Sequence, residues 1–263
     1  MTTQASSVIS ATSGTTAAIG IDIGGTGIKG GVVDLASGAL ISPRVKLPTP
    51  EGGKPDDIAE TTKKVLEQLD ADPHLPIGID FPAVVQHGRT MSAANVSKKW
   101  IGFEAEKFFE QALGRPILFV NDADAAGFAE TEYGAAKGRK GVVMLTTLGT
   151  GIGSALIVDG FLVPNTELGH IELDGHDAEK KAAFSAKERE DLSWEKWGKR
   201  LTKYYQALEK LFSPDLFIVG GGVSKHFDEW GHFVDIRTEM IPAQFLNNAG
   251  ILGAAALAAK AKP

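Results

Sequence analysis

Residues 17 to 35 read AAIGIDIGGTGIKGGVVDL, and residues 142 to 160 read VVMLTTLGTGIGSALIVDG. Each stretch is an apolar run, a glycine-rich turn and a second β-like run, which is the pattern of a hairpin. At an offset of 124 residues, the segment GTGI at 25 to 28 falls on GTGI at 149 to 152, and the flanking apolar runs come into register. The sequence therefore predicts an internal duplication, with two related halves that face each other across a cleft.

The rest of the chain alternates strand-like and helix-like segments. DLFIVGGGVSK at 215 to 225 is typical of a parallel strand that feeds a helix or loop, and ILFV at 117 to 120 is a shorter strand. Helical periodicity predicts a helix with a capping-box-like start at Asp57 and Glu60, and others over 104–113, from 122 to about 137, after Ser193, and over 247–261. This alternation indicates an α/β protein. We expect a disordered tail over 1–17, one domain over 18–121 plus 249–263, and a larger domain over 122–248.

The helix expected after Ser193 carries an amphipathic stripe. We interpret this stripe as core or as a subunit surface rather than a cofactor site. Its members are Trp194, Trp197, Leu201, Tyr204, Leu208 and Leu211.

Composition excludes several classes of protein. The 263 residues include 33 acidic and 27 basic ones, a net charge of −6 that repels nucleic acid and anionic membranes, so neither is expected as a partner. The chain has no cysteine, which excludes disulfides, thiolate zinc sites and a cysteine nucleophile and is consistent with a cytoplasmic location. No apolar run reaches the roughly 18 residues of a membrane span, and the first 17 residues lack the features of a signal peptide.

The first glycine-rich turn formally matches the dinucleotide-binding pattern G-x-G-x-x-G at Gly25, Gly27 and Gly30. In that motif the glycines open a helix, whereas here they lead into a β-like run, so a dinucleotide site is disfavoured. A hairpin turn without side chains can instead donate backbone N–H groups to phosphate oxygens. Lys29 lies beside this turn, and Asp22 at the end of the strand could hold Mg²⁺. The alternative is an ordinary tight hairpin.

Five motifs occur in one order along the chain: DIGGTGIK at 22 to 29, NDADAAGFAE at 121 to 130, LGTGIG at 148 to 153, ELGH at 167 to 170 and IVGGGVSK at 218 to 225. Together they resemble the ROK family of sugar kinases, within the hexokinase–actin superfamily. The segments ELGHIELDGHDAE and LFSPDLFIVGGGVSK most resemble the polyphosphate glucokinases of that family. Most ROK proteins carry a cysteine-rich zinc module after ELGH, and because this chain has no cysteine, structural zinc is not expected.

The resemblance implies two actin-like (ribonuclease H-like) domains and phosphoryl transfer from polyphosphate or ATP to the 6-hydroxyl of glucose, with mannose as a further acceptor and Mg²⁺ as cofactor. It makes Asp122 the general base, although Asn121 or Asp122 could instead cap the following helix. The sugar-binding residues that it implies are Asn95, Asn121, Asp122, Glu167, His170 and Glu195, with Glu172 as the alternative to Glu195. The phosphate-binding residues that it implies are Gly24, Gly25, Thr26, Lys29, Thr150, Gly151, Gly220, Gly221 and Gly222.

The two donors differ in the part of the molecule beyond the terminal phosphoryl group. Adenosine needs an apolar slot, expected near 220–222, whereas polyphosphate needs a basic track. Candidate tracks, which could equally be solvated loops, are Lys137, Arg139 and Lys140, and Lys98 with Lys99.

Other functions stay open at this point. The chain could be a ROK kinase that uses only ATP, or an actin-like nucleotide-binding module without a sugar substrate. A ROK-type repressor is disfavoured because the first 17 residues contain no Lys or Arg. Many family members are dimers, which makes a homodimer an expectation too.

Overall fold

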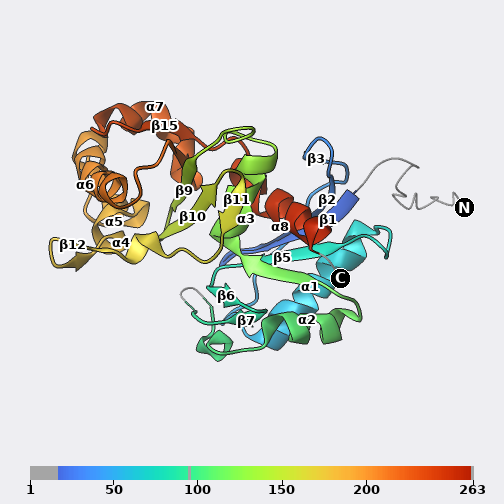
Figure 1. Ribbon diagram of the computed structural model, residues 1–263. Helices are drawn as coiled ribbons and strands as arrows, with labels where there is room; N and C mark the ends of the chain where they lie inside the picture. The colour runs from blue at the N-terminus through green and yellow to red at the C-terminus, as the bar shows by residue number, and fades with distance from the viewer. Residues whose placement is uncertain (1–16, 94–95, 262–263) are drawn as a thin grey trace, which may run out of the picture. The chain divides into compact units, whose positions relative to one another are not determined.

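The computed structural model describes residues 17–93 and 96–261 (Figure 1). The chain divides into two compact units, the first comprising Met1–Ala125 and Gly250–Pro263 and the second Ala126–Ala249. The chain leaves the first unit within α3 (Asp122–Glu132) and returns to it at the start of α8 (Ala249–Lys260). The tail expected over 1–17 lies, except for Ala17, outside the described residues, as does Asn95.

The first unit is built on a sheet with the strand order β3-β2-β1-β5-β8, in which β4 also pairs with β2. Strands β1 and β2 form the antiparallel hairpin expected from the sequence, and β5 and β8 continue the sheet in the direction of β1. The strands are β1 (Ala17–Ile23), β2 (Ile28–Asp34), β3 (Ala39–Leu40), β4 (Val45–Leu47), β5 (Ile77–Phe81) and β8 (Leu118–Asn121). The carboxyl ends of β1, β5 and β8 therefore share one edge of this sheet.

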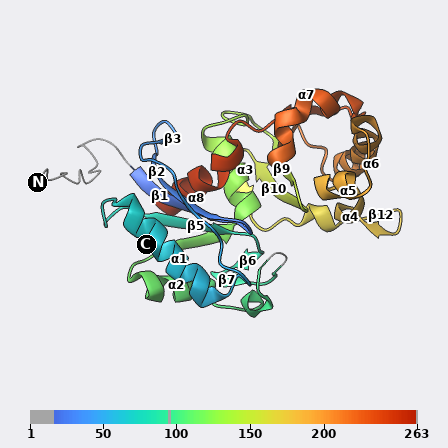
Figure 2. The same ribbon diagram turned by 180° about the vertical axis from the view of Figure 1, so that it is seen from behind.

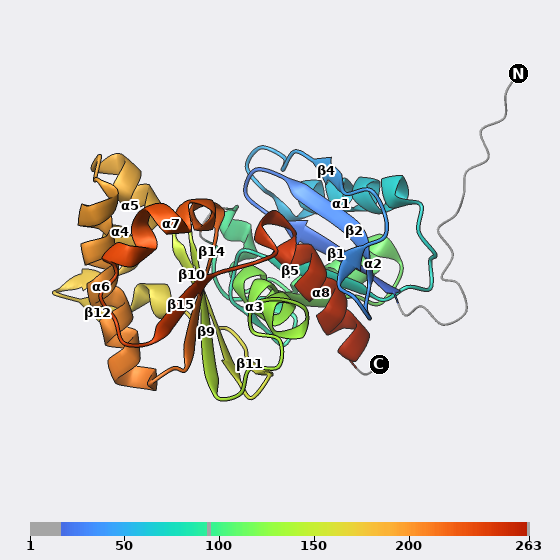
Figure 3. The ribbon, with the colours of Figure 1, turned by 90° about the horizontal axis from the view of Figure 1, so that it is seen from above.

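Helices cover both faces of this sheet (Figures 2 and 3). Helices α1 (Pro55–Leu69) and α2 (Ala105–Leu113) pack over one face, where a core of aliphatic and aromatic residues surrounds Trp100. Helix α8 lies against the other face so closely that a Cβ at Gly20 or Gly78 would lie 1.9 Å from a carbonyl oxygen of α8. Only glycine permits this approach, which explains two of the glycines in the apolar strands.

Smaller elements of the first unit complete the connections. They are β6 (Val85–Gln86), β7 (Arg89–Thr90) and the 3₁₀ helix η1 (Lys98–Trp100).

The second unit repeats this arrangement with the strand order β11-β10-β9-β14-β15. Its hairpin β9–β10 is antiparallel, and β14 and β15 extend the sheet parallel to β9. The strands are β9 (Val142–Leu148), β10 (Ile152–Val158), β11 (Phe161–Val163), β14 (Leu216–Gly220) and β15 (Glu239–Pro242). The expected duplication is thus visible as a shared strand order and shared strand directions.

The register of the duplication differs between its two strands. Ile23 pairs with Ile28 across a turn over 24–27, whereas Leu148 pairs with Ile152 across a turn over 149–151. The second turn is one residue shorter, so the offset of 124 that superimposes β2 on β10 leaves β1 and β9 one residue out of step.

The stripe on α6 (Trp194–Phe212) is part of the core of the second unit. Trp197, Leu201 and Tyr204 have no exposed surface, and only Leu211 at the end of the stripe is widely exposed. Of the two interpretations of this stripe, the core is the one that the structure confirms, because its buried side chains belong to a cluster with Trp230 and with residues of β9 and β14. The remaining elements of this unit are η2 (Leu168–His170), β12 (Glu172–Leu173), β13 (His176–Asp177), α4 (Glu179–Ala182), α5 (Phe184–Arg189), η3 (Gly222–His226), α7 (Phe227–Trp230), η4 (Gly231–Phe233) and η5 (Leu246–Asn248).

Two helix boundaries differ from the sequence-based expectation. Helix α1 begins at Pro55 rather than Asp57, without a side-chain cap, because proline is well suited to the first position of a helix. Helix α3 ends at Glu132 rather than near Lys137, where the Glu130 carboxylate accepts a hydrogen bond from Ala135 N. The expected end of a helix at residue 113 and the expected start of another after Ser193 are confirmed: Gly114, which follows the first helix, adopts a left-handed conformation, and Ser193 Oγ accepts from Lys196 N.

None of the helices in residues 17–93 and 96–261 combines the length and apolar character needed to cross a membrane.

Candidate active site

The turn between β1 and β2 exposes backbone close to a charged pair. Gly24 N donates to Gly27 O at 3.0 Å, and the two residues between them, Gly25 and Thr26, are exposed. Lys29 Nζ lies 2.6 Å from Asp22 Oδ2, and both side chains are mostly buried. This turn can donate backbone N–H groups to an anion, with an ammonium group next to it.

A third carboxylate, Asp80 on β5, lies beside this pair. It faces Asp22 in the strand register and has no exposed surface, and neither of its oxygens has a hydrogen-bond partner among the described residues. Burial, followed by the negative charges of Asp22 and Asp122, raises the pKa of Asp80 well above its usual range, while Lys29 opposes the shift. Sequence reasoning missed Asp80, although an acid within the apolar run IGIDF was a signal that could have found it.

Asn121 and Asp122 form the junction between β8 and α3. Asn121 Oδ1 accepts from Asp124 N at 3.0 Å, and its Nδ2 donates to Ala83 O at 3.0 Å. Asn121 therefore caps α3. The sequence allowed either Asn121 or Asp122 to have this role. Asp122 is exposed at the first position of α3, and its Oδ1 accepts from Ala123 N at 2.8 Å.

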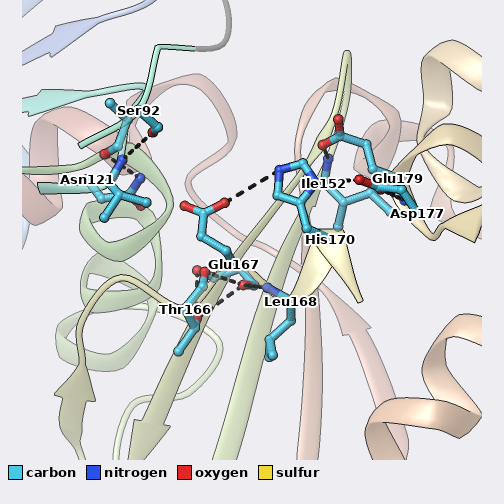
Figure 4. A network of polar contacts seen from close by, with 12 residues as sticks. Ser92, Asn121, Ile152, Thr166, Glu167, Leu168, His170, Asp177 and Glu179 are labelled. Atoms are coloured by element: carbon cyan, nitrogen blue, oxygen red, sulfur yellow. Dashed lines mark hydrogen bonds and ion pairs between the residues drawn. The ribbon is translucent and has the colours of Figure 1, made fainter. Parts of the chain in front are cut away.

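In the second unit, the segment ELGH folds into η2 and directs its two polar side chains toward each other. His170 Nδ1 lies 2.9 Å from Asp177 Oδ2, and His170 Nε2 lies 3.9 Å from Glu167 Oε2 (Figure 4). The hydrogen bond to Asp177, together with nearby carboxylates, raises the pKa of His170 above its usual value. Partial burial raises the pKa of Glu167, and the attraction of His170 opposes this shift. Asp177, which orients the imidazole, was also missed by sequence reasoning.

The turn between β9 and β10 differs from its counterpart because an acid lies beneath it. Glu179 Oε2 accepts from Ile152 N at 2.8 Å, and a Cβ at Gly151 would lie 2.2 Å from the same oxygen. Thr150 is exposed, and its carbonyl accepts from Ser185 Oγ. Glu179 thus already occupies one backbone donor of this turn, which the sequence comparison of the two turns did not reveal.

The glycines after β14 form a sharp exit from the sheet. Gly220 ends the strand, Gly221 has a φ of +83°, and Gly222 begins η3. A Cβ at Gly221 would lie 2.4 Å from Leu148 O, so this turn needs glycine on two grounds.

Both acidic alternatives for the sugar site are exposed in the second unit. Glu195 is exposed in the first turn of α6 and pairs with Lys199 at 2.5 Å. Glu172 is exposed at the start of β12.

The candidate basic tracks are exposed in both units. Lys137 and Lys140 lie in the segment that joins α3 to β9, and Arg139 between them pairs with Glu239 at 3.3 Å. Lys98 and Lys99 are exposed on η1.

A cavity of about 500 Å³ in the second unit is lined by Asp177 but by none of the residues expected to bind sugar or phosphate. It lies among β12, β13, α4 and α6, with Tyr204 among its lining residues. We therefore do not assign sugar or phosphate binding to this cavity.

Oxygen donors of the kind that Mg²⁺ prefers lie at the edge of the first sheet. Among the described residues, no group of three or more His, Asp or Glu side chains converges to hold a metal. Mg²⁺ commonly uses one or two protein carboxylates, with substrate phosphates and waters as its other ligands. Asp22 and the unpartnered Asp80 supply such a pair of oxygen donors.

Two units with the same strand order, each opening on an antiparallel hairpin with a glycine turn, define an α/β protein of the actin-like type to which hexokinases belong. The model of the ROK family matches residues 18–184, and the chain belongs to this family.

Among curated relatives, the chain is 48% identical over 237 residues to the polyphosphate glucokinase of Mycobacterium tuberculosis (strain CDC 1551 / Oshkosh), covering 90% of this chain and 89% of the relative. Among solved structures, it is similar to the inorganic polyphosphate/ATP-glucomannokinase of Arthrobacter sp. strain KM, with a TM-score of 0.87 and 52% identity over 92% of this chain and 98% of that one. It is also similar to a ROK family glucokinase from Streptomyces griseus in complex with glucose and AMPPNP, with a TM-score of 0.80 and 25% identity over 93% of this chain and all of that one.

Proposed function

We propose that this chain is a sugar kinase that transfers a phosphoryl group from polyphosphate, ATP or both to the 6-hydroxyl of glucose, with mannose as a further acceptor. The observation that carries the proposal is the relationship to polyphosphate glucokinases along nine tenths of the chain. The similarity to a glucomannokinase that uses both donors supports the breadth of donor and acceptor.

Asp122 is the proposed general base. A sugar hydroxyl is a weak nucleophile, so a carboxylate must take its proton as the bond to phosphorus forms. Asp122 suits this task because its carboxylate is exposed at the start of α3, while the cap of that helix is supplied by Oδ1 of Asn121.

Glu167 and His170 are the proposed partners of the sugar hydroxyls, together with Asn95, Asn121 and either Glu195 or Glu172. Asp177 accepts from Nδ1 of His170, which fixes the imidazole and leaves Nε2 for a ligand. Glu167 presents a carboxylate that accepts hydrogen bonds from hydroxyl groups.

The phosphate groups of the donor would meet the glycine turns at 24–26, 150–151 and 220–222, with Lys29 as a cation. Mg²⁺, which Asp22 would hold, would offset the negative charge on the phosphoryl group during transfer.

The test is glucose phosphorylation by the purified protein, measured side by side with ATP and with long-chain polyphosphate. Product formed with polyphosphate, with or without product from ATP, supports the proposal, whereas product from ATP alone selects the second candidate, a ROK kinase restricted to ATP. No glucose 6-phosphate from either donor would overturn it.

An actin-like module without a sugar substrate is separated by a binding measurement. A ligand that binds only the folded protein raises the midpoint of thermal unfolding, so a sugar kinase should be stabilised by glucose without any donor. A midpoint that responds to ATP but not to glucose or mannose would favour the module.

We further propose that the two compact units are the two domains of the kinase, that the protein acts in the cytoplasm, and that it forms a homodimer. The lack of cysteine supports the location. Because the α6 stripe is buried, the dimer surface must lie elsewhere.

A further inference from the structure

Asp80 is a buried acid whose carboxylate oxygens accept no hydrogen bond from the described residues. It is the second-last residue of β5, beside Asp22 of β1, with no exposed surface, and neither Oδ1 nor Oδ2 has a hydrogen-bond partner in the described part of the chain. Burial of an ionised carboxylate without a partner is strongly unfavourable. A residue kept in such a place needs a compensating cation, a proton or a functional reason.

The surroundings of Asp80 carry an excess of negative charge. The carboxylates of Asp22 and Asp122 act on Asp80, and Lys29 is the cation that acts on it, so three acids face one ammonium group. Lys29 is itself paired with Asp22 at 2.6 Å, so a cation shared by Asp80 and Asp22 would offset charge that this one ammonium group leaves.

The start of α8 approaches these acids closely. A Cβ at Gly250 would lie 2.6 Å from Asp80 Oδ2 and 3.3 Å from Cβ and Cγ of Asp22. The same point therefore adjoins both carboxylates, and it is free of side-chain atoms only because residue 250 is glycine.

We propose that Asp80 acts with Asp22 as a ligand of the divalent cation that accompanies the phosphoryl donor. This inference rests on the proposed function and adds to it a cation ligand that no sequence motif indicated. Two carboxylates with donor phosphate oxygens are the donor set that suits Mg²⁺. The alternative is that Asp80 is a protonated core residue without a ligand.

The test uses Mn²⁺ as a probe, because free Mn²⁺ is counted directly by electron paramagnetic resonance. Binding is measured for the wild type, Asp80→Asn and Asp80→Thr, with and without inorganic tripolyphosphate and without glucose, so that no sugar is phosphorylated. The control is Glu106→Gln, which changes a half-buried acid of α2 that accepts from Phe119 N. Thermal unfolding of the metal-free proteins is measured in parallel.

We expect both Asp80 variants to bind Mn²⁺ at least about tenfold more weakly with tripolyphosphate present, because one of two carboxylate ligands is lost. Glu106→Gln should bind Mn²⁺ as the wild type does. The metal-free Asp80 variants should unfold at a higher temperature than the wild type, because the unpartnered acid is gone.

Mn²⁺ affinity within twofold of the wild type in a folded Asp80 variant would overturn the inference and mark Asp80 as a core acid. The two substitutions differ in shape and polarity, so either one that folds suffices. If the wild type phosphorylates glucose but the Asp80 variants bind Mn²⁺ as tightly as the wild type, this inference is refuted and the proposed function is not. A wild type without glucose phosphorylation refutes the proposed function whatever the Mn²⁺ titrations give.

Discussion

Asn121 and Asp122 are neighbours at the junction of β8 and α3, but their side chains differ in burial and in hydrogen bonding. The amide of Asn121 is used on both sides, by Asp124 N and by Ala83 O, and it is buried. The carboxylate of Asp122 is exposed one residue later. Because the cap is supplied by Asn121, a substitution at Asp122 should alter chemistry more than folding.

We expect Asp122→Asn to lower kcat by about 10² or more, at the low end for loss of a general base, while glucose binding changes less. The measurement is a coupled assay of glucose 6-phosphate formation, with glucose affinity determined separately. Glu132→Gln, at the other end of α3, removes the same charge and should keep activity near the wild-type level. Activity of Asp122→Asn within tenfold of the wild type would contradict the assignment.

The contact between His170 and Asp177 predicts a measurable titration. We expect Asp177→Asn to lower the pKa of His170, because the hydrogen bond to the Asp177 carboxylate is the largest cause of its raised value. The imidazole pKa is read from an NMR titration, and the KM for glucose should rise more than kcat falls. Asp174→Asn, a nearby exposed acid that pairs with Lys203, serves as the control and should leave the titration of His170 in place.

The raised pKa of His170 also has a consequence for stability. The protonated imidazole stabilises the folded chain fully at pH values below its unfolded pKa, and this contribution is lost as pH rises through the folded value. Asp177→Asn should therefore lower the free energy of unfolding more at acidic pH than at alkaline pH. An effect of the substitution that is independent of pH would show that the pair acts only by packing.

At the scale of elements, the approach of α8 to β1 and β5 decides which residues these strands tolerate. Residues 20 and 78 face the backbone of α8, where a Cβ would lie 1.9 Å from a carbonyl oxygen. A run such as IGIDF is strongly apolar and needs no glycine for its own conformation. The need arises only from the helix that packs on it.

We expect Gly78→Ala to destabilise the protein by about 3 kcal/mol, because its Cβ would lie 1.9 Å from Ala254 O and α8 must move. Gly114→Ala is the comparison, because its Cβ would meet nothing within 4 Å. We expect this variant to lose only about 1 kcal/mol of stability, which is the cost of the left-handed backbone conformation for alanine. Urea unfolding of both variants tests this order. A Gly78→Ala protein as stable as the wild type would show that α8 does not pack as described.

At the scale of the whole molecule, the choice between ATP and polyphosphate as phosphoryl donor depends on residues beyond the catalytic centre. Both donors end in the same phosphoryl group, so the residues around that group do not discriminate between them. Discrimination belongs to residues farther along the donor. The exposed segment with Lys137, Arg139 and Lys140 is one candidate, although Arg139 already pairs with Glu239.

We expect the combined change of Lys137, Arg139 and Lys140 to alanine to raise the KM for polyphosphate about tenfold and that for ATP less than about twofold, because a longer polyanion meets more cations. The control is the pair Lys63→Ala and Lys64→Ala on the exposed face of α1. Equal losses with both donors would remove this track, and a selective loss in a Lys98→Ala, Lys99→Ala variant would move it to η1.

The sequence by itself determined the two hairpins, the α/β class, the end of α2 at Gly114 and the start of α6 at Ser193. Each of these depends on local chemistry: a glycine turn between apolar runs, a left-handed residue after a helix, or a hydroxyl that accepts from the first turn. The family motifs also indicated Asp122, Glu167 and His170 as site residues. Their roles remain proposals.

Only the tertiary structure decided which distant residues meet. Asp80 became a neighbour of Asp22 because β1 and β5 pair in parallel, and the strand register alone sets that match. Asp177 reached His170, and Glu179 reached the turn at Gly151, through loops whose course has no local signature. The burial of the α6 stripe likewise results from the sheet beneath it. Pairing between distant segments depends on the packing of the whole unit, whereas the order of residues along the chain expresses only local preferences.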